Sequence, residues 1–328
     1  MKNAKSFAVS MIVTLAGLCF APAVLAQEWP VPDRPIRILM PFPPGGTADT
    51  LSRLIANRLT IQLGLPVVVE NKPGASTLIA VNELRRSAPD GHTILYTVTG
   101  TTSQLPHLYA KPPYDPFTDF TPLGLAAYNQ LILTVTRNAP YNTLRELIDY
   151  ARAHPGKVNY ASFGNGSFTH IVSELLKKTE GIEMTHVPYK GGAPAAQAVF
   201  AGEVQILFDA PLTAINNARG GKVKLLAIAG PEHIAAIPKV PTMADAGLKG
   251  FDIPGLEQLL GPSGMSGELV AKVNAAIMKA VRSPEIAKVY REGGFVFVAS
   301  TAEEHARIMR ENYERWGEVI RRTGIRLD

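Results

Sequence analysis

Cysteine is nearly absent from this 328-residue chain, since Cys19 is its only one. A lone thiol cannot form a disulfide within the chain, and a metal site built from several cysteines is also excluded. Basic residues exceed acidic ones by only 33 to 28, a surplus too small to indicate a nucleic-acid partner. There is no His-Glu-x-x-His motif and the seven histidines are scattered, so we predict neither a metal ion nor another cofactor.

Long hydrophobic runs are missing too, apart from an apolar stretch at residues 7–18. Lys2 and Lys5 precede this stretch, and a small-residue segment ending at Ala26 follows it. This order is typical of a secretory signal peptide, and the apolar stretch is too short to span a bilayer comfortably. A single-span anchor is the weaker alternative. We therefore predict that residues 1–26 are a signal peptide and that the protein is periplasmic.

The remaining sequence alternates short apolar strands with amphipathic helices. This alternation is typical of α/β proteins in which helices cover both faces of parallel sheets. Capping-box spacing places the start of one helix at Thr143 and Glu146, and that of the last helix at Ser300 and Glu303. Predicted strands cover residues 36–40, 66–70, 92–98, 158–162, 184–187, 204–208 and 223–228; predicted helices cover 51–63, 76–86, 143–153, 170–178, 268–281 and 284–292.

Three glycine-containing loops join a predicted strand to a predicted helix, at residues 41–49, 162–170 and 189–194. In open parallel sheets, ligands bind beyond the carboxyl ends of strands, where helices begin. Free backbone N–H groups and the helix dipole favour an anion at such a place. Thr47 or Asp49 is expected to cap the first of these helices. One such loop alone is more typical of a tight turn, but together they indicate an anion-binding cleft.

An enzyme remains the alternative to a binding protein. Ser167 and His170 are three residues apart near a helix start, which leaves open an exported hydrolase acting on small esters or amides. However, Thr169 stands where a Gly-x-Ser-x-Gly motif needs its last glycine, and no orienting acid is identifiable. Asp209 follows an apolar strand, where it either caps a loop or contacts a ligand.

Residues 35–49 resemble the opening of the Bordetella uptake gene (Bug) receptors, the extracytoplasmic substrate-binding proteins of tripartite tricarboxylate transporters. The similarity continues in the family's order and covers essentially the whole mature chain. It departs from the usual pattern at residues 253–256, a stretch that commonly carries a tryptophan. The other matching segments are residues 69–75, 89–95, 187–192, 241–247, 315–316 and 324–325.

This resemblance implies a two-lobed, periplasmic-binding-protein-like (type II) flytrap with mainly parallel sheets flanked by helices. Lobe 1 would comprise residues 27–124 plus 252–328, and lobe 2 residues 125–251. The resemblance also implies a receptor without catalytic activity. Such a receptor would be monomeric, capture a small di-, tri- or aromatic carboxylate between its lobes, and deliver it to a small and a large permease subunit.

The ligand contacts implied by the resemblance come mainly from the first two loops, with further walls near residues 99–101 and at Asp209. Phe163 and Phe168 flank the second loop, where they either favour an aromatic acid or belong to the core. The implied ligand-binding residues are Phe42, Gly45, Gly46, Thr47, Asp49, Thr99, Thr101, Ser162, Gly164, Gly166, Ser167, Thr169, His170 and Asp209.

Overall fold

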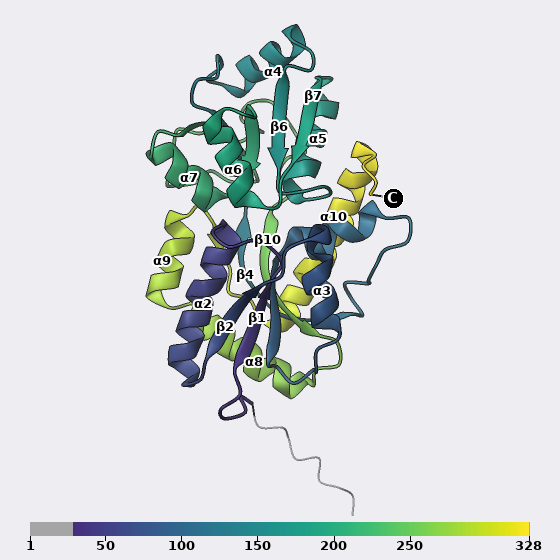
Figure 1. The fold of residues 1–328 in the computed structure, drawn as a ribbon, viewed down its shortest axis with the longest axis vertical. Helices are drawn as coiled ribbons and strands as arrows, with labels where there is room; N and C mark the ends of the chain where they lie inside the picture. Colours follow the sequence, from purple (N-terminus) through teal and green to yellow (C-terminus); the bar gives the residue numbers. More distant parts are fainter. Residues whose placement is uncertain (1–28, 328) are drawn as a thin grey trace, which may run out of the picture.

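Two β-sheets, one above the other in Figure 1, form the frame of the molecule. The structure is a computed structural model and describes residues 29–327. The predicted signal peptide, residues 1–26, lies outside the described residues. The chain leaves the first sheet after β4 (Phe120–Asn129) and returns to it at β10 (Gly255–Pro262), so each sheet belongs to one of two units.

The first sheet has six strands in the order β11-β4-β10-β3-β1-β2, and the second has five in the order β7-β6-β8-β5-β9. In the first sheet β1 is parallel to β2 and β3, whereas β10 is antiparallel to β3 and β4. In the second sheet β6 is parallel to β7 and β8, whereas β5 is antiparallel to β8 and β9. The other strands are β1 (Ile36–Met40), β2 (Val67–Asn71), β3 (Thr93–Val98), β5 (Leu131–Thr136), β6 (Val158–Ser162), β7 (Met184–Pro188), β8 (Ile206–Asp209), β9 (Val223–Ala229) and β11 (Val296–Phe297).

The two-lobed α/β fold agrees with the prediction, but the expectation of mainly parallel sheets was wrong, because both sheets are mixed. The reason is the path of the chain between the sheets. Strand β4 leads out of the first sheet and β10 leads back into it, so these neighbours run in opposite directions. Neither was predicted as a strand, since the buried Glu257 and Gln258 interrupt the apolar run of β10 and Pro122 and Gly124 interrupt β4.

Helices cover both sheets and begin largely where local capping signals place them. Thr143 accepts a hydrogen bond from the Glu146 backbone N–H at 3.1 Å, which confirms the predicted cap of α4. The last helix was predicted one residue early, because Thr301 is its cap and Ser300 instead accepts a hydrogen bond from the N–H of Leu125 in β4. The helices are α2 (Thr47–Leu63), α3 (Leu78–Arg85), α4 (Leu144–Ala153), α5 (Phe168–Glu180), α6 (Gly192–Ala201), α7 (Pro211–Arg219), α8 (Gly267–Val281), α9 (Pro284–Glu292) and α10 (Ala302–Thr323).

The C-terminal helix α10 links the two units. It packs against β4 of the first sheet and against α5 of the second, and Figure 1 shows it extending alongside both. At the α5 contact, the rings of Phe168 and Trp316 meet edge to face with centroids 5.1 Å apart. Phe168 is therefore a packing residue of the junction between the units, and the position of the second predicted loop depends on this contact.

Candidate ligand-binding cleft

A cavity of about 530 Å³ is lined by residues of both units. The first sheet contributes the segments that follow β1, β2 and β3, and the second sheet those that follow β6, β7 and β8. All six segments lie at carboxyl ends of strands, as expected for a ligand site in an α/β protein. Lining residues are 41–43, 46–49, 73–77, 163–169 and 189–192, together with Val98, Gly100, Leu105, Asn129, Leu131, Asp209, Ala210, Thr213 and Glu257.

The first loop ends at Gly46, which is the N-cap of α2 and provides no capping side chain. Thr47 and Asp49 therefore do not cap this helix, contrary to the sequence-based expectation. The carboxylate of Asp49 instead accepts hydrogen bonds from the N–H of Gly45 at 3.0 Å and from Nδ2 of Asn71 at 2.8 Å. This bracing leaves the first backbone N–H groups of α2, which lack intrahelical acceptors, for a ligand.

Asp49 holds this loop as a charged group. Burial by itself would raise its pKa, but hydrogen bonds from Arg53, Asn71 and the Gly45 N–H keep the pKa below its usual value. The closest guanidinium contact, from Nη2 of Arg53 to Oδ1 of Asp49, is 2.9 Å. Gly45 adopts a φ of +91°, a conformation that L-residues rarely adopt, so its glycine is required by the backbone.

The second loop, residues 163–169, is organised by its own side chains. Ser167 caps α5 by accepting a hydrogen bond from the N–H of His170, and Oγ1 of Thr169 accepts one from the N–H of Phe163 at 2.9 Å. Nδ1 of His170 accepts one from the N–H of Gly166 at 3.0 Å. These bonds use three N–H groups of the loop and its helix start, those of Phe163, Gly166 and His170.

Two stacked imidazoles support the second loop from behind. The rings of His170 and His186 are 4.0 Å apart and inclined by 8°, and Nε2 of His186 lies 2.7 Å from Oγ of Ser162. Burial, followed by the neighbouring His170, lowers the pKa of His186 to about 4, and burial also lowers the pKa of His170. Both rings are therefore neutral at pH 7. His170 is occupied with Gly166 rather than aligned on Ser167, so the arrangement is that of a loop support and not of a catalytic pair.

Residues 75–77 form a further wall, of which Ser76 and Thr77 had been predicted as the start of a helix. Ala75, Ser76 and Thr77 have φ values of 46°, 49° and 81°, so α3 begins only at Leu78. Oγ of Ser76 donates a hydrogen bond to the carbonyl of Asn165 at 3.0 Å, which joins the two units across the cleft. The Pro-Gly pair directly before this turn was the available signal, because it follows a strand and marks a chain reversal.

A second hydrogen bond crosses the cleft between the helices that follow β1 and β8. The hydroxyls of Thr47 in α2 and Thr213 in α7 are 2.7 Å apart. Nearby, a Cβ added to Gly191 would lie 2.9 Å from Cδ of Pro43, so the third predicted loop also contacts the opposite unit. The cleft is thus in a closed conformation in this structure.

Three buried polar side chains, Asn129, Asp209 and Glu257, also border the cavity, and we call them the acceptor wall. Glu257 accepts hydrogen bonds from the hydroxyl of Tyr96 at 2.7 Å and from Nδ2 of Asn129 at 2.6 Å. Asp209 accepts one from the N–H of Ala210 at 2.8 Å. Burial raises the pKa of both acids to about 7.

The predicted site residues divide into those that border the cavity and those that support it. Thr99 and Thr101 are fully buried and do not line the cavity; Thr99 accepts a hydrogen bond from the N–H of Leu256, and Thr101 bonds to Thr97. Gly45, Ser162 and His170 likewise stabilise the loops from behind. The lining residues among those predicted are Phe42, Gly46, Thr47, Asp49, Gly164, Gly166, Ser167, Thr169 and Asp209.

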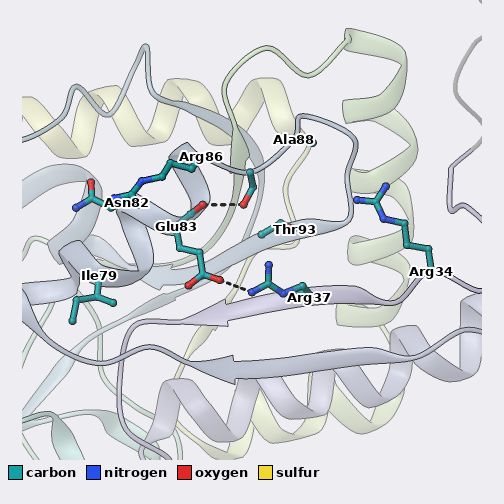
Figure 2. Close-up of a pocket in the computed structure, with 9 residues that line it drawn as sticks. Arg34, Arg37, Ile79, Asn82, Glu83, Arg86, Ala88 and Thr93 are labelled. Atoms are coloured by element: carbon teal, nitrogen blue, oxygen red, sulfur yellow. Dashed lines mark hydrogen bonds and ion pairs between the residues drawn. The ribbon is translucent and has the colours of Figure 1, made fainter.

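A larger and more open hollow of about 780 Å³ lies on the surface of the first unit, with several arginines around it (Figure 2). Two of its three arginines are already engaged, since Arg37 pairs with Glu70 and Glu83 and Arg34 pairs with Asp90 at 2.7 Å. Figure 2 shows the Glu83 side chain directed at Arg37, and the hydrogen bonds of the two glutamates raise the pKa of this arginine. The hollow is therefore a surface ion-pair network, and the cleft is the stronger candidate site.

Within residues 29–327, no group of three or more His, Cys, Asp or Glu side chains is arranged to hold a metal ion. The helices of the same part of the chain also include none that is both long and apolar enough to cross a membrane.

Comparison with known proteins identifies the family. Residues 51–325 match the tripartite tricarboxylate transporter family receptor. A protein of the tcbD-tcbE intergenic region of Pseudomonas sp. strain P51 is 32% identical over 290 residues, which are 88% of this chain and 86% of that protein. BugT of Bordetella pertussis is 29% identical over 320 residues, 97% of each chain.

Solved structures agree with this match. Rpa4515 of R. palustris, solved with adipate, has a TM-score of 0.86 at 30% identity, covering 91% of this chain and 99% of that one. MatC from Rhodopseudomonas palustris, solved with malate, has a TM-score of 0.84 at 32% identity, covering 88% and 100%. The family that matches is a family of receptors. The chain therefore belongs to the tripartite tricarboxylate transporter receptors, the Bug and TctC-like family of periplasmic solute-binding proteins.

Proposed function

We propose that this protein captures a small organic carboxylate between its two units and delivers it to the small and large membrane subunits of a tripartite transporter. The observation that carries the proposal is the cavity bordered by two helix N-termini, those of α2 and α5, which belong to different sheets. Such termini bind anions through backbone N–H groups and the helix dipole. The adipate and malate bound by two structural relatives are carboxylates, which supports the same ligand class here.

We further propose that residues 1–26 direct export to the periplasm and are removed. The lobes then correspond to the two sheets with their helices. The first crossing is better placed at Gln130 than after residue 124, because β4 pairs with β10 from Phe120 to Asn129 without leaving the first sheet. The return crossing falls between β9 and β10. The monomeric state remains a prediction.

The ligand class is tested with matched acids and amides. Isothermal titration of the purified mature chain with adipate, malate and benzoate, each beside its amide, should show binding for an acid and little for its amide. A hydrogen bond to a charged group contributes about 1.5–3 kcal/mol, so losing two weakens binding about a hundredfold or more. Equal affinity for an acid and its amide would exclude an anion site.

The place of binding is tested with Gly46→Val. A Cβ at Gly46 meets no atom within 4 Å and its φ is −81°, so valine is compatible with the fold but projects beside the free N–H groups of α2. We expect ligand-induced thermal stabilisation to be lost while the unliganded protein melts normally. Gly267→Val, at the start of α8 with similarly open space, is the matched control and should bind as the parent does. Normal binding by Gly46→Val would show that the first loop is only a turn.

A further inference from the structure

The cavity is bordered by both hydrogen-bond donors and hydrogen-bond acceptors. The starts of α2 and α5 provide N–H donors, whereas the acceptor wall consists of Asn129, Asp209 and Glu257. These three side chains are 5%, 2% and 2% exposed, so the wall is desolvated. Lys190 is the one lysine among the lining residues, no arginine lies among them, and Lys190 itself is exposed. A second carboxylate placed against this wall would meet buried acids without a cation to offset the repulsion.

Asn129 provides a separate indication that a ligand completes this wall. Its Nδ2 donates to Glu257, which fixes the orientation of the amide and leaves Oδ1 as an acceptor. That Oδ1 atom is buried and has no hydrogen-bond partner in the part of the chain that the structure describes. A buried acceptor without a partner destabilises the folded state, so such groups are generally satisfied by a hydrogen-bond donor.

Asp209 also has a carboxylate oxygen that remains to accept a hydrogen bond from a ligand. It ends β8, pairs in register with Ile132 of β5, and precedes α7, so it lies beside the crossing that carries Asn129. One of its oxygens accepts the N–H of Ala210, and its residual exposure is toward the cavity that it lines. No lysine or arginine neutralises it, since the pKa of Asp209 is raised by burial and opposed only by that one backbone hydrogen bond.

We propose that the acceptor wall binds a hydrogen-bond donor of the ligand, while the helix starts bind its carboxylate. The ligand class is therefore an acid that also carries a hydroxyl, carbamoyl or ammonium group, in preference to an acid whose far end is a second bare carboxylate. This inference rests on the proposed carboxylate receptor function and concerns the same cleft. Ammonium is the strongest of the three donors for an ionised Asp209, because the hydrogen bond is then charge-assisted on both sides.

The test uses two series of linear acids that differ only at the far end. The four-carbon series is succinate, its monomethyl ester, succinamate, 4-hydroxybutanoate, 4-aminobutanoate and butanoate. The six-carbon series has the same end groups. Titration calorimetry at pH 8 on the mature chain should show, in the series whose length fits, at least tenfold tighter binding of donor-bearing acids than of the dicarboxylate, the ester or the plain acid. The ranking of ammonium against hydroxyl and carbamoyl identifies the donor.

Three variants locate the effect. Asp209→Asn should weaken binding of the ammonium-bearing acid at least tenfold and tighten binding of the dicarboxylate. Glu257→Gln should change both affinities in the same directions but to a smaller degree. Asp149→Asn, on the exposed face of α4, is the matched control and should change nothing. A dicarboxylate that binds tightest in the parent, or a ranking unchanged by Asp209→Asn, overturns the acceptor-wall inference and leaves the receptor function intact. If no acid of either series binds to the folded parent, it is the carboxylate function itself that fails.

Discussion

Asp49 and Asp209 border the same cleft, are 3% and 2% exposed, and lie near the starts of α2 and α7, yet their pKa values move in opposite directions. Asp49 has Arg53, Asn71 and the Gly45 N–H as partners, whereas among residues 29–327 Asp209 has only the Ala210 N–H. The difference shows that the partners of a buried acid, rather than its burial, determine its role. The charge of Asp49 is used to hold a loop, and that of Asp209 remains for a ligand.

Because their pKa values move in opposite directions, Asp49 and Asp209 contribute to stability in different pH ranges. The pKa of Asp209 rises to about 7 on folding, against about 3.9 in an unfolded chain, so the folded state retains a proton that the unfolded state has lost. Stability from this group therefore falls as the pH rises from about 4 to about 7 and stays low above that. For Asp49 the folded pKa is lowered, so its contribution is present above the unfolded pKa and is lost as the pH falls through the folded one.

The largest expected effect is a gain of stability from Asp209→Asn. Asparagine has the same shape and still accepts the Ala210 N–H, but it removes the cost of burying a charge. A shift of about three pKa units corresponds to about 4 kcal/mol, which is the upper limit of the gain at pH 8 in the unliganded protein. Urea unfolding at pH 8 and at pH 4 measures it, and the gain should nearly vanish at pH 4.

Glu257→Gln is the comparison variant for this gain. Glu257 accepts two hydrogen bonds from Tyr96 and Asn129, so an amide NH₂ there would face one of these donors. Its gain should therefore be smaller than that of Asp209→Asn. If Asp209→Asn destabilises the protein at pH 8, or changes the free energy of unfolding equally at pH 8 and pH 4, Asp209 is not an uncompensated charge. The contrast with Asp49 then does not hold.

A smaller effect of opposite sign is expected for Asp49→Asn. This change weakens the hydrogen bond from Arg53 and sets an amide hydrogen against one of three donors, at a cost of about 1–3 kcal/mol at pH 7. The loss should shrink as the pH is lowered below 4, because the native Asp49 then also becomes neutral. Urea unfolding of the unliganded variant provides the measurement, with Asp149→Asn as an exposed control. A loss that is the same at every pH would attribute the effect to packing rather than to charge.

The comparison also shows which parts of the site the sequence could predict. The loop containing Asp49 and the one containing Thr169 were found because strand, glycine turn and helix start are local patterns. Asn129 and Glu257 were missed because they meet through the pairing of β4 with β10, strands whose interacting side chains are 128 residues apart in sequence. Ala75 was also missed: the preceding Pro-Gly pair signals a turn, but the residue type of Ala75 does not indicate a φ of 46°. Local signals predicted the donors of the cleft and one of its acceptors, Asp209, whereas the acceptors Asn129 and Glu257 depend on topology.

The smallest expected effect concerns the hydrogen bond between Thr47 and Thr213, which connects the helix held by Asp49 to the helix that follows Asp209. Because it spans two units, it exists only when the cleft is closed, and a ligand that closes the cleft gains it in addition to its own contacts. We expect a double-mutant cycle with Thr47→Val and Thr213→Val to give a coupling of about 0.5–1.5 kcal/mol in the free energy of ligand binding.

The interpretation of this coupling depends on the same measurement in the unliganded protein. If the empty cleft is open, the same cycle applied to urea unfolding without ligand should give no coupling, and small-angle scattering should show a smaller radius of gyration once a carboxylate saturates the parent. Ser167→Trp, which fills the second loop, should weaken binding and prevent that compaction together. Coupling in the empty protein, with an unchanged scattering profile on binding, would instead mean that Thr47 and Thr213 hold a permanently closed pocket. Asp49 and Asp209 would then border a fixed site, and ligand would enter without hinge motion.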